Sequence, residues 1–236
     1  MNLVKYCKAS HVTDAVEKGR IFVGTFSRYS KIERDVLRDE EEGAATTAVL
    51  DDEADLILSE NDNESLLANS PLKLANGWKL ELPRHMPLWL AKPAFNTFIF
   101  CVSDDPDPSV EKAARLGYDS FYRITDPFSF GQALMISISQ NLGTKFGVDG
   151  RMGPVNYVPR KIQVVNRRRS SPPVNGFSNE DLFRKHERFS DDREFRFVFL
   201  EYSNAEQSLF NSFNSEGEIV ENPEIAKWVR RIDNNG

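Results

Sequence analysis

The stretch from Leu182 to Tyr202, LFRKHERFSDDREFRFVFLEY, decides the fold. From Arg193 onward its residues alternate between the two faces of a strand. One face carries three phenylalanines, Phe195, Phe197 and Phe199. The other begins with Glu194 and Arg196 and continues with apolar side chains. This pattern predicts a central, half-buried strand from Arg193 to Tyr202, with a strand paired on each side and cover over both faces.

Glu194 is the first candidate functional residue. An acid on a core strand needs a partner or a task, because an unpaired buried charge costs several kcal/mol or shifts its pKa. Polar residues on or beside other predicted strands complete the candidate set: Lys5, Tyr6, Ser27, Tyr29, Arg38, Glu42, Lys185 and Arg196. The purely structural alternative is an ion-pair network that joins Glu194 and Arg196 to Arg38, Glu42 or Lys185.

Composition places the chain among globular proteins. It has 236 residues, of which 40% are hydrophobic, and it contains 17 Phe. The net charge of −6 disfavours wholesale binding to nucleic acids or membranes. No apolar run approaches the roughly 20 residues of a membrane span, and the start MNLVKYCKAS lacks a signal-peptide core. Cys7 and Cys101 have no CxxC neighbour, so we expect two reduced thiols in a cytoplasmic protein with no membrane partner.

The order of elements predicts the fold class. We expect strands at 3–8, 20–25, 95–103, 119–124, 153–158 and 161–165, and helices at 10–18, 110–116, 127–142, 179–188 and 223–232. Asn76-Gly77 predicts a hairpin over 72–82, and the proline-punctuated section 83–93 predicts a loop. The prediction is α+β: a single domain over 1–236, with a mostly antiparallel bent sheet and flanking helices.

An acidic segment interrupts this order. Eight acids lie between Asp39 and Asp55, which predicts an acidic, mobile insertion at about 39–69. The segment is either a metal site, an interaction surface or a solvated loop. It has no EF-hand spacing, and none of the three histidines has a paired ligand, so we expect no metal. The loop at Arg167–Arg169 could bind phosphates or simply be exposed.

Both ends of the chain resemble a group of uncharacterised bacterial and phage proteins. The opening has the group's "KY" strand at Lys5-Tyr6, then a Tyr-x-x-Ile-Glu turn that starts at Tyr29, then Arg38-Asp39 followed by Glu42-Gly43. The stretch FRKHERFSDDREFRFVF is similar to the group's closing strand, with its Lys, an aromatic residue and Glu-x-Glu-x-Arg. Asp192 replaces the first Glu of that signature. The resemblance implies a fold and a site, and no reaction.

The strand order is also similar to that of ADP-ribosyltransferases, which break the bond between ribose and nicotinamide in NAD. That bond breaks through an oxocarbenium-like state, which a nearby carboxylate stabilises. The similarity implies that Tyr6 or Lys5 holds NAD, that Ser27 or Tyr29 frames the nicotinamide, and that Glu194 is catalytic. The first strand lacks the family's usual Arg or His, and Ser27 does not lie in a Ser-Thr-Ser run.

Two functions are therefore compatible with the sequence. One is a NAD-consuming transferase, a toxin or a phage or defence effector, that acts on a protein or nucleic-acid target. The alternative is a non-catalytic phage or bacterial interaction protein that binds a protein partner through its acidic surface or its basic loop. The enzyme is favoured if Tyr6, Ser27 and Glu194 line one cleft, and disfavoured if Glu194 is sealed against Arg38.

Overall fold

The computed structural model describes residues 1–29, 44–67, 72–93, 97–142, 146–158, 163–168, 182–203 and 216–232. Contacts divide the chain into two compact units. Unit 1 comprises Met1–Glu42, Phe95–Tyr157 and Lys185–Gly236, and unit 2 comprises Gly43–Ala94 and Val158–Arg184. The α+β class with a mainly antiparallel sheet and helices is confirmed. The single domain with an insertion at 39–69 stays a prediction.

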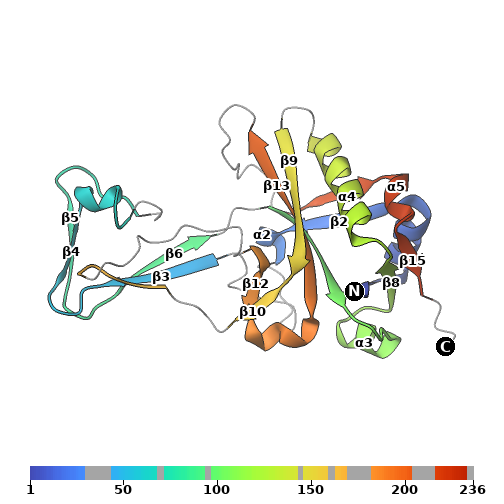
Figure 1. Cartoon of the computed structure of the whole chain (residues 1–236), viewed down its shortest axis with the longest axis horizontal. Coiled ribbons are helices and arrows are strands. Elements are labelled where there is room, and N and C mark those ends of the chain that lie inside the picture. The colour runs from blue at the N-terminus through green and yellow to red at the C-terminus, as the bar shows by residue number, and fades with distance from the viewer. Residues whose placement is uncertain are drawn as a thin grey trace. The chain divides into compact units, whose positions relative to one another are not determined.

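Unit 1 is built on one antiparallel sheet of eight described strands. They are β1 (Leu3–Cys7), β2 (Arg20–Thr25), β7 (Phe98–Asp104), β8 (Ser120–Ile124), β9 (Phe146–Pro154), β13 (Glu194–Ser203), β14 (Glu218–Glu221) and β15 (Val229–Arg231). β13 pairs with β7 on one edge and with β9 on the other, as Figure 1 shows for β9. The predicted interior strand is therefore confirmed. It is buried on both faces from Glu194 to Leu200, not half-buried.

The sheet divides at the other edge of β7. β2 pairs with the start of β7, at Phe98 and Ile99, and β1 pairs with its end, at Ser103 and Asp104. One branch continues from β2 to β14, and the other from β1 through β8 to β15. On this edge no described strand pairs with β7 between these two contacts, whereas β13 pairs with it continuously along the other edge.

The core of unit 1 is an aromatic cluster beneath α4 (Pro127–Leu142), the helix expected at 127–142. The ring of Phe197 lies 5.3 Å from that of Phe130 on α4 and 6.2 Å from that of Phe100 on β7. Gly131 permits this close approach, because a Cβ there would lie 3.1 Å from the Phe197 ring. Asp126 caps the helix by accepting the Phe128 and Ser129 N–H groups.

Two other helices depart from their predicted limits. The first begins at Ala9, as α1 (Ala9–Thr13), and continues as the π-helix η1 (Asp14–Lys18) up to Gly19. At its start, the Asp119 carboxylate accepts the Ala9 N–H at 2.7 Å. The last helix, α5, is only Pro223–Ala226, because the chain then pairs with β8 as β15. The remaining helices of unit 1 are α2 (Phe26–Tyr29) and α3 (Val110–Arg115).

The predicted helix at 179–188 is wrong where the structure describes it. Arg184–His186 form the short strand β12, and Glu187–Asp192 form the 3-10 helix η4. Lys185 on β12 is bonded to Asp192 and Glu194, and this contact holds the segment extended where its sequence suggests a helix. β10 covers Asn156–Val158.

Unit 2 contains five described strands. They are β3 (Ala44–Leu50), β4 (Leu56–Ser59), β5 (Lys79–Leu82), β6 (Leu88–Pro93) and β11 (Gln163–Asn166), with the 3-10 helix η2 (Glu60–Asn63) after β4. β3 pairs with β6 antiparallel and with β11 in parallel. Leu56 and Leu58 are buried in its core, so the described part of the acidic segment includes folded strands.

Two predictions in unit 2 are wrong. The turn at Asn76-Gly77 exists, with Gly77 at φ 77°, but β5 pairs with β4 and residues 72–75 form no strand. The buried leucines of β4 lie opposite Leu80 and Leu82, and this apolar pairing prevails over the local hairpin. The expected loop at 83–93 contains β6, whose Leu90 is buried in the same core.

Replacing Phe197 by alanine should lower the free energy of unfolding by about 3–5 kcal/mol, because it empties the centre of the aromatic cluster. The matched control is Phe128→Ala on α4, whose side chain is 59% exposed. That change should cost less than about 1 kcal/mol. Denaturant unfolding of the two variants measures the difference. Equal losses would contradict the assignment of the core.

Candidate functional site

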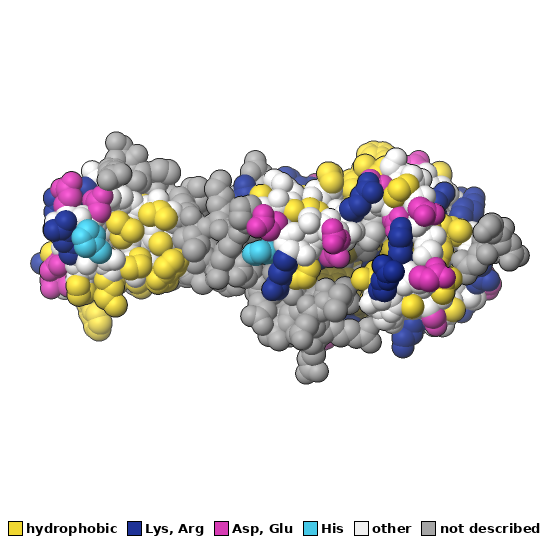
Figure 2. All heavy atoms as spheres, turned by 90° about the horizontal axis from the view of Figure 1, so that it is seen from below, with side chains coloured by type: hydrophobic (Ala, Val, Ile, Leu, Met, Phe, Trp, Pro, Cys, Tyr) yellow, Lys and Arg dark blue, Asp and Glu magenta, His cyan; other side chains and the backbone are white. Residues whose placement is uncertain are grey.

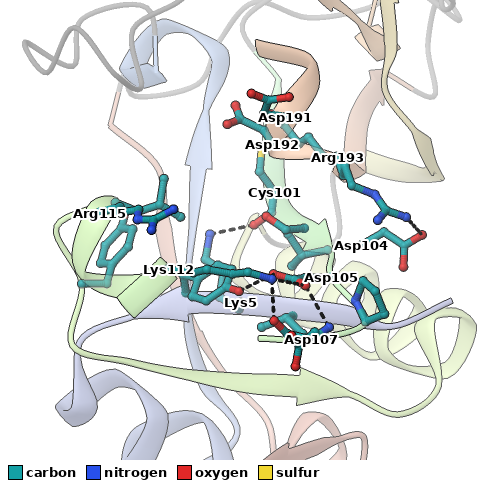
Figure 3. Close-up of a pocket in the computed structure, with 18 of the residues that line it drawn as sticks. Lys5, Cys101, Asp104, Asp105, Asp107, Lys112, Arg115, Asp191, Asp192 and Arg193 are labelled. Carbon is teal, nitrogen blue, oxygen red and sulfur yellow. Dashed lines mark hydrogen bonds and ion pairs between the residues drawn. The ribbon is translucent and has the colours of Figure 1, made fainter. Parts of the chain in front are cut away.

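A pocket of about 500 Å³ opens in unit 1, where the sheet divides. Its walls come from β1, the end of β7, α3, η4 and the start of β13 (Figure 3). Five of the residues named from the sequence line it: Lys5, Tyr6, Tyr29, Lys185 and Glu194. These side chains come from distant parts of the chain, and the sheet brings them together.

Lys5 occupies the point where the two branches separate. Its Nζ donates to the backbone carbonyl of Cys101 at 2.7 Å and lies 4.8 Å from the centre of the Phe100 ring. Cys101 lies between the β7 residues that pair with β2 and those that pair with β1. The ammonium therefore contacts the β7 backbone between the two branches, and Lys5 lines the pocket there.

Tyr6 forms part of the wall next to Lys5. It is buried, and its hydroxyl donates to Asp105 at 2.6 Å. Lys112 on α3 donates to the same carboxylate at 2.9 Å. Burial, and then the hydrogen bond to Asp105, raises the pKa of Tyr6, so the phenol stays neutral. Its single donor is therefore used inside the protein, and only its oxygen can still accept a hydrogen bond.

Glu194 lies in a buried ion network. Its Oε1 accepts from Arg196 Nε at 2.6 Å, and its Oε2 accepts from Lys185 Nζ at 2.8 Å. Arg196 is 0% exposed and lies behind the pocket wall, over the Phe26 ring. Burial alone would raise the pKa of Glu194, but the attraction of Arg196 and Lys185 outweighs it and holds that pKa well below its usual range. Glu194 is therefore an ionised carboxylate.

Asp192 is a second carboxylate of the same network. It accepts from Lys185 at 3.1 Å, and its side chain is 27% exposed in the pocket. Burial raises the pKa of Asp192, and Lys185 offsets only part of that rise. Two carboxylates thus share one ammonium while their environments move their pKa values apart, which is typical of acid–base pairs in enzymes.

Backbone geometry aims the two carboxylates at Lys185. Arg193, between them, has φ 44°, a left-handed conformation that is strained for a bulky side chain. The Glu194 N–H donates to the Tyr157 hydroxyl at 2.7 Å, which fixes the start of β13. Burial raises the pKa of Tyr157 to about 12, so this hydroxyl is neutral at physiological pH.

Tyr29 lines the pocket and lies against β2. A Cβ at Gly24 would lie 2.9 Å from its ring, so this glycine is what allows the ring to approach the strand. Ser27 belongs to α2, but its side chain lies outside the described residues, as do Arg38 and Glu42. Of the three residues predicted to line one cleft, Tyr6 and Glu194 line the pocket, and the Ser27 side chain lies outside the described residues.

Several pocket residues were not predicted from the sequence. Arg115 and Lys112 come from α3, and Asp105 comes from the turn DDPDPS before it. That turn combines several acids with prolines directly after a buried strand, and this combination is the signal that could have marked it. Tyr157, which is outside the pocket lining and contacts the start of β13, carried no signal in the sequence.

The acidic segment and the basic loop neutralise each other in unit 2. Arg168 Nε contacts both carboxylate oxygens of Asp51 at 2.9 Å, and its NH1 lies 3.2 Å from Glu53. Arg167 lies 3.4 Å from Asp62. Within the described ranges, no three acidic, histidine or cysteine side chains gather as a metal site. No described helix is long and apolar enough to cross a membrane.

No protein-family model, curated protein or solved structure matches this chain. The similarities noted from the sequence therefore stay predictions, and the pocket itself has to carry any assignment of function.

Replacing Glu194 by glutamine should cost about 3–5 kcal/mol of stability at neutral pH, because Arg196 would lose the Glu194 charge and Lys185 would keep only Asp192 of its two carboxylate partners. Since the folded pKa of Glu194 is lowered, its contribution is full above the unfolded pKa of about 4.3 and is lost as the pH falls through the folded pKa. The difference between wild type and variant should shrink between about pH 4 and pH 2. Denaturant unfolding across this range measures it.

Glu17→Gln is the control, because Glu17 is exposed on η1. Its effect should stay within about 0.5 kcal/mol at every pH. A Glu194→Gln difference that does not change with pH would show that the carboxylate is not held ionised by its neighbours.

Proposed function

We propose that this protein is a NAD-consuming transferase that moves ADP-ribose to a macromolecule, and that the pocket in unit 1 is its active site. The observation that carries the proposal is the convergence of Lys5, Tyr6, Tyr29, Lys185 and Glu194 on one pocket. These residues come from four separate parts of the sequence: β1, α2, β12 and the start of β13.

The pocket has the size and the chemistry that this substrate requires. About 500 Å³ lies within the range of roughly 300–1,000 Å³ that small-molecule sites occupy. Aromatic rings line it at Tyr6, Tyr29 and Tyr118, and these can pack against the flat rings of a dinucleotide. The ionised Glu194 supplies the negative charge that suits a sugar carbon as it becomes positive.

Asp192 and Glu194 have different roles in this proposal. Lys185 and Arg196 keep Glu194 ionised and fixed, so its charge is present before the reaction begins. Asp192, more exposed and with a raised pKa, is the better proton acceptor. When the bond between ribose and nicotinamide breaks, its electron pair leaves with nicotinamide. The acceptor's nitrogen or oxygen then bonds to the ribose carbon and gives its proton to Asp192.

The acceptor is a protein or a nucleic acid, in keeping with a toxin or a phage or defence effector. A large acceptor must reach the reacting carbon from outside. Asp191 precedes the two carboxylates and Arg193 lies between them; both line the pocket and are exposed, so a bulky target could approach there.

A non-catalytic interaction protein is the second candidate. The acidic surface is a weak candidate for its binding site, because Asp51, Glu53 and Asp62 are paired within unit 2. The observation that favours this candidate is exposed apolar surface, because Trp78 and Trp89 of unit 2 are 69% and 55% exposed. Figure 2 shows apolar side chains gathered on one face of this unit.

Incubation of the protein with labelled NAD and a cell lysate tests the proposal. Wild type should release nicotinamide and transfer label to a macromolecule. Asp192→Asn should keep the fold and lower turnover by about 100-fold or more, as expected for loss of a general base. Glu194→Gln, assayed at a temperature where it remains folded, should lose at least as much. Glu17→Gln should match wild type.

Wild type that never consumes NAD with any lysate would end the transferase proposal. Turnover that survives both carboxylate changes would place the chemistry elsewhere in the chain.

A further inference from the structure

We propose that Lys5 and Arg115 form an anion subsite in this pocket that binds the diphosphate of a dinucleotide. The anion subsite stands on the pocket alone, whereas its assignment to a dinucleotide rests on the proposed function.

Most cations of the pocket already have carboxylate partners. Lys112 is paired with Asp105 at 2.9 Å, Arg193 lies 3.8 Å from Asp104, and Lys185 is shared by two carboxylates. Figure 3 shows the pair of Lys112 with Asp105 and the pair of Arg193 with Asp104. Such cations offer little net attraction to an incoming anion, because each faces a fixed negative charge.

Lys5 is different. Its ammonium contacts a backbone carbonyl and an aromatic ring, and no carboxylate of the described residues forms an ion pair with it. A lysine ammonium has three donors, of which Cys101 takes one. The side chain is half-buried at the point where the sheet divides, so its charge is screened less than a surface charge.

Arg115 is the second such cation. It lies in the last turn of α3, is exposed, and lines the pocket with Lys5. No described carboxylate lies within ion-pair distance of its guanidinium. Glu111, one turn earlier on the helix, is attracted to it only through space. Its planar group of donors is therefore available to a ligand.

The two cations suit a phosphate ligand. A guanidinium binds two phosphate oxygens side by side, and an ammonium adds a point charge from another direction. They belong to α3 and β1, whereas the acidic side chains Asp191, Asp192 and Glu194 belong to η4 and β13. Asp104, Asp105 and Asp107 also line the pocket, and Arg193 and Lys112 are paired with the first two. A diphosphate held by Lys5 and Arg115 would direct an attached ribose toward Asp192 and Glu194.

Calorimetric titration with ADP-ribose, ADP and adenosine tests the subsite. Arg115→Gln should weaken binding of ADP-ribose and ADP by about tenfold or more, because a charge-assisted hydrogen bond is lost. Adenosine affinity should not change. Arg115 is exposed, so this variant keeps the fold. Lys5→Met should produce the same pattern once its melting temperature confirms folding, and Lys79→Met, an exposed lysine of unit 2, should behave as wild type.

The outcomes separate the two proposals. Unchanged ADP-ribose affinity in Arg115→Gln, or no binding of any phosphate ligand by wild type, would overturn the subsite, whatever the NAD assay gives. Binding of ADP that depends on Arg115, in a protein that never consumes NAD, would support the subsite and contradict the transferase.

Discussion

The burial of one carboxylate at the start of the central strand governs this structure. β13 needs apolar cover on both faces, yet it begins with Glu194, whose charge cannot be left alone in the interior. Arg196 on the same strand and Lys185 on β12 compensate it. This requirement explains why Arg184–His186 are extended and why Arg193 takes a left-handed conformation between two acids. A valine at this position would pack without ion-pair partners, whereas Glu194 requires partners in well-defined geometry.

A second constraint is the division of the sheet along β7. Because β1 and β2 pair with different ends of the same edge, the middle of that edge is open to a side chain, and Lys5 fills it. The pocket at this part of the edge is lined by the Glu194 ion network, by the loop after β7 and by α3. The pocket thus lies beside two energetically costly features. One is the buried ion network, and the other is the part of the β7 edge between its contacts with β1 and β2. Proteins tolerate such features mostly where a ligand uses them.

Local patterns predicted what local physics controls. The alternating phenylalanines predicted β13, and an acid among core residues singled out Glu194. Prediction failed where a partner that is distant in the sequence determines the local structure. The Asn76-Gly77 turn suggested a hairpin, but the leucines of β4 select β5 instead. Arg115 was not predicted, because the direction of a helical side chain depends on how α3 docks beside β8, which no local pattern shows.

The central claim is that the Glu194 network is retained for the pocket and not for stability. The most direct measurement is the unfolding free energy of the triple variant Lys185→Met, Glu194→Leu, Arg196→Met. Replacing buried ion-pair partners together by apolar groups is often neutral or stabilising, whereas removing one member is costly. Asp192, the member that stays, is 27% exposed and keeps contact with water. The triple variant should therefore be within about 1 kcal/mol of wild type or more stable, and well above Glu194→Gln. A triple variant as unstable as Glu194→Gln would show that the fold itself requires the charges, and would contradict the claim.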